Sequence, residues 1–185
     1  LDPKDDAEFG QALKNIQEQK FQEGYNILQT TPDKNQKNPY RRLAVAFAQQ
    51  QLGKGEEAKQ TLRQLTGAAD VEARIKLWAW TALRSLGEQP DQKTAAQVLG
   101  VVFEVPIPEQ TGFDVLAAYA DGRVHYINYS GKAAIWDKIG GDVSNLAQKV
   151  VRSAQAGVND FPLVQNRPPM KDTNIRITLL TCGGL

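Results

Sequence analysis

A step of 34 residues in the first half of the chain constrains its fold more than any other sequence feature. Gly53 and Gly87 are separated by this step, and each follows a leucine and precedes a polar residue. The same step relates Phe9 to Leu43 and Leu77, Ala12 to Ala46 and Trp80, Gly24 to Ala58, and Leu28 to Leu62. Such a repeat predicts pairs of antiparallel helices, because a small residue early in the second helix allows close approach and a leucine fills the seam behind it.

This pattern resembles the tetratricopeptide repeat, a helix-turn-helix unit of the same length. The resemblance covers residues 5–100; it is best for 39–72, weaker for 5–38, and fades after Gly87 in the third copy. In the best copy, the family's small, turn and seam positions hold Ala46, Gly53, Ala58 and Leu62. The resemblance implies an N-terminal α-α superhelix of stacked helix pairs.

The chain departs from the family at the family's tryptophan position, which holds Glu8, Arg42 and Lys76 in the three copies. Its apolar stripe also lies one residue later than in the family. Apolar residues still recur at helical spacing, so the helix pairs remain predicted. The resemblance therefore supports the stacked helix pairs more firmly than it supports any particular partner.

Proteins of this family bind peptides or proteins in a concave groove formed by the first helix of each repeat. Carried over by position, the resemblance implies a groove lined by Phe9, Leu13, Leu43, Phe47 and Leu77. Alternatively, these five residues are core and the second half of the chain covers them, because three repeats without a polar capping helix leave an apolar end.

The second half of the chain is predicted to form strands. Val, Ile, Tyr and Thr become frequent near Val101, and Asp121-Gly122 is a two-residue hairpin signal. We place the boundary between Leu99 and Val101, which gives a helical repeat domain at 1–99 and an α+β domain at 100–185. The predicted fold class is therefore α+β, with a small antiparallel sheet packed against one helix.

The α+β domain is predicted to contain a first strand, a three-stranded meander, a helix and a last strand. These elements are expected at 101–105, at 113–120, 123–128 and 132–136 with turns at Asp121-Gly122 and Ser130-Gly131, at Asp142–Ala156, and at Asn174–Thr181. Closing both turns on two residues pairs Tyr119 with Val124 and places Trp136 beside His125. The segment 116–136 also resembles uncharacterised bacterial proteins, a likeness that implies no activity.

Both faces of this sheet are predicted to be apolar and therefore covered. One cover is the helix at 142–156, with Asp142 as its cap, Gly157 as its stop, and Val143, Leu146, Ala147, Val150 and Ala154 on its apolar side. The other cover is either the helical repeats or a second subunit, in a homodimer formed through the second sheet face.

The composition offers few of the side chains that enzymes commonly use for catalysis. One His and one Cys nearly exclude zinc clusters, Cys/His dyads and disulfide frameworks, and neither Gly-Gly pair has the spacing of a nucleotide loop. We therefore expect no catalytic residue, no metal and no cofactor, and an enzyme is the less favoured class. The alternative function is a small-molecule-binding or hydrolytic domain with a pocket formed by His125, Tyr126 and Trp136.

The net charge and the hydropathy pattern limit the kinds of partner and the compartment that can be expected. Lys+Arg 22 against Asp+Glu 21 gives a net charge of +1, which argues against nucleic-acid binding. Apolar runs fall short of the ~18 residues of a membrane span, and the start of the chain has no signal-peptide core. Together with the single Cys182, these features favour the cytoplasm. Because the chain does not begin with Met, a leader that has been removed remains an alternative. The leading prediction is an interaction or scaffold protein that binds a protein or peptide through its helical surface.

Overall fold

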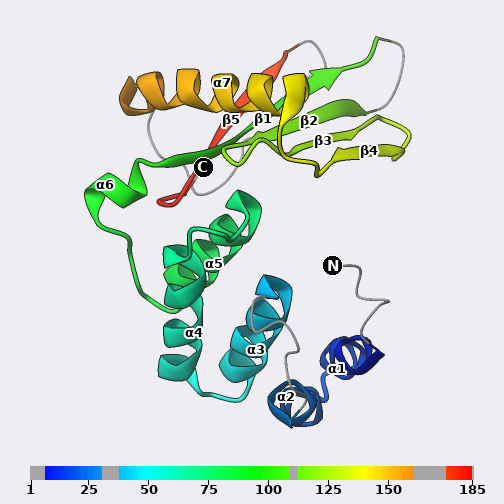
Figure 1. Ribbon diagram of the computed structural model, residues 1–185, viewed down its shortest axis with the longest axis vertical. Coiled ribbons are helices and arrows are strands. Elements are labelled where there is room, and N and C mark those ends of the chain that lie inside the picture. Colours follow the sequence, from blue (N-terminus) through cyan, green and yellow to red (C-terminus); the bar gives the residue numbers. More distant parts are fainter. Residues whose placement is uncertain (1–6, 31–37, 109–111, 161–173, 185) are drawn as a thin grey trace. The chain divides into compact units, whose positions relative to one another are not determined.

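The computed structural model describes residues 7–30, 38–108, 112–160 and 174–184 (Figure 1). Within these residues, helices and one antiparallel sheet form an α+β fold, as predicted. The helices are α1 (Ala7–Gln17), α2 (Phe21–Thr30), α3 (Pro39–Gln51), α4 (Gly55–Gly67), α5 (Ala73–Ser85), α6 (Gln92–Ala95) and α7 (Gly141–Gly157), the last followed by the 3₁₀ turn η2 (Val158–Asp160). The strands are β1 (Val98–Pro106), β2 (Phe113–Tyr119), β3 (Val124–Ile127), β4 (Ala133–Trp136) and β5 (Arg176–Thr181).

The 34-residue step is a repeat of the three-dimensional structure. α1 packs on α2 and α3 packs on α4, and α2 also contacts α3. The ends of α1, α3 and α5 have the same backbone geometry: φ is 61° at Gln19, 74° at Gly53 and 82° at Gly87. At each end the next N–H donates to the carbonyl five residues earlier, from Lys20 to Asn15 (2.8 Å), Lys54 to Gln49 (2.9 Å) and Glu88 to Leu83 (3.0 Å). These are three copies of one Schellman cap.

Small side chains bring the paired helices together, as the spacing predicts. A Cβ added to Gly24 would lie 2.8 Å from Cγ1 of Ile16 and 3.0 Å from the carbonyl oxygen of Ala12, so α1 and α2 are in close contact there. Ala58, one step later, is fully buried. The third copy has a complete first helix, but its second helix, α6, has four residues.

The contacts divide the chain into two compact units, which we call the helical unit and the sheet unit. The helical unit comprises residues 1–71 and 78–88, and the sheet unit comprises 72–77 and 89–185. β1 begins at Val98, before the predicted boundary between Leu99 and Val101. The sequence does not indicate this early start, because glycine at position 100 is unfavourable inside a strand. In the structure a Cβ added to Gly100 would lie 3.1 Å from Cδ1 of Tyr119, so the missing side chain leaves room for the tyrosine ring.

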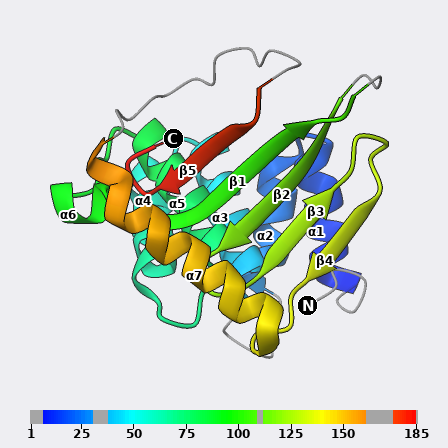
Figure 2. The same ribbon diagram turned by 90° about the horizontal axis from the view of Figure 1, so that it is seen from above.

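The sheet has the strand order β4-β3-β2-β1-β5, and all neighbours are antiparallel (Figure 2). The last strand joins it beside β1, so β5 and β4 are its two edges. α7 packs on one face, where Val101, Ala118 and Val124 meet the helix at Ala147 and Val151. We call this the helix-covered face and the other the second face.

Both hairpins close on three residues, and the predicted two-residue closures are wrong. Ala118 pairs with Val124, and Ile127 pairs with Ala133. In the first loop the N–H of Gly122 donates to Tyr119 (2.9 Å) and the N–H of Tyr119 donates to Arg123 (2.9 Å). The second loop repeats this arrangement around Gly131. Each is a type I turn followed by a glycine with positive φ, which adds one residue to the loop.

The longer loops change which side chains share a face. Trp136 pairs with Val124, and His125 pairs with Ile135, so the predicted neighbours His125 and Trp136 are not paired. A shift of one residue moves a strand's side chains to the opposite face. Val124 and Trp136 therefore lie on the helix-covered face, and His125 lies on the second face with Ala117.

α7 confirms the predicted helix and part of its predicted apolar face, because Ala147 is buried against the sheet and Val150 and Ala154 pack against the same core. Its N-cap is Gly140 (φ 99°), so Asp142 lies in the first turn and is not the cap. The buried positions are Ser144, Ala147 and Val151, whereas the predicted face residues Val143 and Leu146 are 43% and 59% exposed. The small Ser144 and Ala147 let the helix approach the sheet closely, which turns the larger side chains outward.

Candidate functional site

A groove of about 580 Å³ opens on the helical unit between α1, α3 and α5; we call it the apolar groove. Its walls include Phe9 and Leu13 from α1, Leu43 and Phe47 from α3, and Trp78 from α5. Further lining residues are Ile16, Tyr40, Ala44, Ala46, Gln50, Leu62 and Ala82. This volume falls within the range of protein sites that take up small molecules or anchoring side chains.

Four of the five residues predicted for the groove line it: Phe9, Leu13, Leu43 and Phe47. Leu77 is not among the lining residues, and the next residue, Trp78, is. The sequence carried this signal, because Trp78 stands 34 residues after Ala44, another lining residue. On α5 the face toward the groove is therefore one residue later than the carry-over from the repeat family placed it.

The lining residues differ in burial. Phe9 is 3% exposed and belongs to the core that α1, α2 and α3 form among themselves. Phe47 and Trp78, however, are 46% and 51% exposed. The ring of Phe47 meets that of Phe21 edge to face, with 6.1 Å between centroids, so one side of Phe47 is supported and the other is open.

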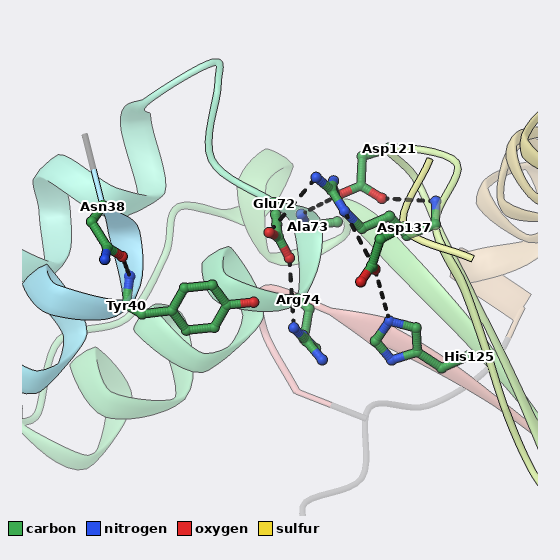
Figure 3. Close-up of polar contacts among 9 residues, drawn as sticks. Asn38, Tyr40, Glu72, Ala73, Arg74, Asp121, His125 and Asp137 are labelled. Carbon is green, nitrogen blue, oxygen red and sulfur yellow. Dashed lines mark hydrogen bonds and ion pairs between the residues drawn. The ribbon is translucent and has the colours of Figure 1, made fainter. Parts of the chain in front are cut away.

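Buried polar contacts hold the helices that form the groove walls. Asn38 caps α3, and its side-chain oxygen accepts the N–H of Tyr40 at 3.0 Å (Figure 3). The same oxygen accepts the N–H of Arg41 at 3.3 Å. The guanidinium of Arg41 is buried and donates to the carbonyl of Leu28 at 2.8 Å, which satisfies a carbonyl in the last turn of α2. These bonds fix α3 against α2, on which α1 also packs, so they help to hold two of the groove walls in place.

The sheet unit carries a separate polar cluster that includes Glu72, Asp121 and Asp137 (Figure 3). The guanidinium of Arg123 lies 2.8 Å from Asp121, 3.7 Å from Glu72 and 3.7 Å from Asp137. Asp121 also accepts the N–H of Ala73 at 2.8 Å, in the first turn of α5. A carboxylate at a helix N-terminus satisfies an otherwise unpaired donor and interacts favourably with the helix dipole. The cluster therefore holds the first turn of α5 against the β2–β3 turn.

His125 belongs to the edge of this cluster and not to the predicted pocket. Its Nε2 lies 3.3 Å from Asp137, and its ring meets Tyr119 edge to face at 5.4 Å. Burial raises the pKa of the Tyr119 hydroxyl above its ordinary value. Trp136 and Tyr126 project from the other face, so the structure does not bring the three predicted pocket residues together.

Tyr126 has a structural contact on the helix-covered face. Its hydroxyl donates to Asp114 at 2.5 Å, and this hydrogen bond is the main cause of the raised pKa of Tyr126. The other carboxylate oxygen of Asp114 accepts the N–H of Tyr129 at 3.0 Å. Asp114 therefore ties β2 and β3 to the turn before β4.

The described part of the chain contains no group of three or more His, Cys, Asp or Glu placed to hold a metal ion. None of its helices is long and apolar enough to cross a membrane.

No family model, curated protein or solved structure matches the chain. Function is therefore inferred from the chemistry of the apolar groove itself.

Proposed function

We propose that the helical unit is a protein-interaction module whose apolar groove holds large apolar side chains of a peptide segment from a partner protein. The observation that carries the proposal is the half-exposure of Phe47 and Trp78 in one apolar groove. Exposed aromatic side chains that line a hollow are typical of binding sites, because each anchor loses its contact with water on binding. The resemblance to tetratricopeptide repeats supports the same surface.

The lining defines the chemistry of the partner. Gln50 offers one amide to orient the bound segment, and the other lining side chains are apolar or aromatic. Each buried Leu- or Phe-sized anchor contributes about 1.5–3 kcal/mol before ordering costs. Two or three anchors therefore supply about 3–9 kcal/mol before these costs, so we expect weak binding, with a dissociation constant on the order of 10 µM or higher. Because none of the described lining residues is charged, the affinity should change little with salt.

The test is selection of short peptides from a random displayed library on the immobilised protein, followed by affinity measurement. The variant Phe47→Glu places a charge at the groove wall. The matched control is Ile127→Glu, because Ile127 on β3 has the same exposure, 46%. We expect selected peptides with two or more large apolar residues, equal affinity for the control, and at least tenfold weaker binding to Phe47→Glu, about 1.4 kcal/mol.

Retained helical circular dichroism in Phe47→Glu shows that any loss of binding is local. If the selected peptides bind Phe47→Glu as well as the unmodified protein, the groove is not their site and the proposal fails.

We do not extend the proposal to a small-molecule or hydrolytic site at His125 and Trp136. That site requires the two side chains to converge, and the strand pairing gives them opposite faces of the sheet. The ring and polar contacts of His125, with Tyr119 and Asp137, are those of a side chain packed at a sheet surface.

A further inference from the structure

β5 is an edge strand: no described strand pairs with its outer side, where the described residues form one isolated bridge, between Thr181 and Gly184. The direction of its backbone groups follows from two contacts at its end. The N–H of Cys182 donates toward β1, to the carbonyl of Gln97 (3.3 Å), whereas the N–H of Thr181 donates away from β1, to Gly184 (2.9 Å). Successive residues of a strand alternate in this direction, so the N–H and C=O groups of Ile177 and Leu179 point outward.

The side chains at these outward-bonding positions are apolar and lie on one face. Ile177 and Leu179 pair with Phe103 and Val101 of β1 on the helix-covered face, and they line a groove of about 430 Å³ beside α7. Ile177 is 59% exposed, and Ile175, just before the strand, is 63% exposed. At Ile177 and Leu179 the edge thus combines a stripe of aliphatic side chains with outward backbone groups that no described strand pairs with.

The two edges of the sheet differ in how they resist further pairing. β4 has four residues and is flanked by Lys132 and Lys138, and both short length and lysines discourage edge-to-edge contact. β5 has six residues, without proline. Its single charge, Arg176, is held by Glu104 of β1, with Nε–Oε2 2.5 Å and Nη2–Oε1 2.6 Å. β5 is therefore the edge at which another strand can be added.

We propose that β5 pairs antiparallel with β5 of a second copy of this chain, which joins the two sheets edge to edge. About a two-fold axis, outward-bonding residues of one copy face outward-bonding residues of the other, so the aliphatic stripe becomes continuous. An axis at Thr178 places Ile177 opposite Leu179 of the other copy and keeps the two Arg176 side chains apart. The net charge of +1 adds little repulsion between copies.

The outer surface of α7 favours this edge contact over a stack of two sheets through their helix-covered faces. Asn145, Lys149 and Arg152 are exposed along that surface and would be buried in such a stack. Side-by-side pairing leaves them in water. The outward groups of Thr181 already bond Gly184, so the pairing is limited to residues 176–180. Two strands of this length cover less than the ~800 Å² per partner of a standard interface, so we expect a weak dimer, with a dissociation constant on the order of 10 µM or higher.

Sedimentation equilibrium of the full chain over a range of concentrations tests the proposal. Ile177→Lys and Ile175→Lys add a charge to the β5 edge at exposed positions. Ile135→Lys on β4 is the matched control, because Ile135 is 58% exposed on the other edge strand. We expect dimerisation of the unmodified protein and of the control, and at least tenfold weaker dimerisation of both β5 variants.

Amide hydrogen exchange adds a readout of the strand pairing itself. The amides of Ile177 and Leu179 should become protected as concentration rises, whereas the amide of Thr178, which faces β1, should be protected at every concentration. A protein that stays monomeric, a dimer that Ile135→Lys weakens equally, or a dimer without protection at Ile177 and Leu179 would each overturn the proposal.

Discussion

The glycine at the end of α3 offers a clean measure of the backbone geometry that defines the repeat. Gly53 has φ 74°, and a Cβ built on it would meet no atom within 4 Å. Gly53→Ala therefore changes the backbone preference without a steric clash. Gln19, one repeat earlier, already places a side chain in the same conformation, with φ 61°. Gln19→Gly is thus the reverse experiment within the same protein.

The expected size of the effect follows from two opposing contributions. An L-residue in the left-handed region costs roughly 1–2 kcal/mol. Alanine recovers about 0.4–1 kcal/mol because it restricts the unfolded chain more than glycine does. Gly53→Ala should therefore lower the free energy of unfolding by about 1 kcal/mol, and Gln19→Gly should raise it by about 0.5–1 kcal/mol.

Urea unfolding followed by far-ultraviolet circular dichroism measures both changes. The slope of free energy against urea should stay constant, so that shifts in midpoint report stability. A Gly53→Ala protein as stable as the unmodified one, or a destabilised Gln19→Gly protein, would refute the claim that these turns need a left-handed residue.

Two further predictions concern the sheet unit. Gly122→Ala should cost at least about 2 kcal/mol, because the added Cβ would lie 2.0 Å from Oγ of Ser144 at φ 89°; Gly131→Ala, with open space and φ 83°, should cost about 1 kcal/mol in urea unfolding. Burial raises the pKa of Tyr119 above its ordinary value of 10.0, so its stabilisation is present below pH 10 and is lost as the pH rises through the folded-state pKa. Tyr119→Phe should reduce this alkaline loss, and an unchanged stability profile between about pH 9 and 11 would contradict it.

Much of the helical unit could be predicted from the sequence because its structure is local and periodic. Gly53 and Gly87 each mark a helix cap whose hydrogen bonds span only five residues. A short sequence motif is therefore enough to predict this part of the structure. The predicted groove residues came from the resemblance to the repeat family, and they line the observed groove except on α5, where Trp78 lines it and Leu77 does not. One residue of helix is a rotation of about 100°, so a shift of that size moves a side chain out of the groove.

The sheet unit was less predictable because its register depends on loop geometry. Asp121-Gly122 fits a two-residue turn and also the end of a three-residue loop, and the composition does not distinguish the two. The longer loop moved His125 and Trp136 to opposite faces and removed the predicted pocket. The cluster around Arg123 was likewise not visible, because it joins Glu72 to strands about fifty residues away in the chain.

The indole N–H groups of Trp78 and Trp136 provide the most direct test of groove binding. Trp78 lines the apolar groove, whereas Trp136 lies on β4 of the sheet unit. In a ¹H–¹⁵N correlation spectrum titrated with a selected peptide, the indole N–H of Trp78 should shift with saturation and that of Trp136 should stay in place. A peptide that shifts Trp136 and leaves Trp78 unchanged would contradict the proposed function.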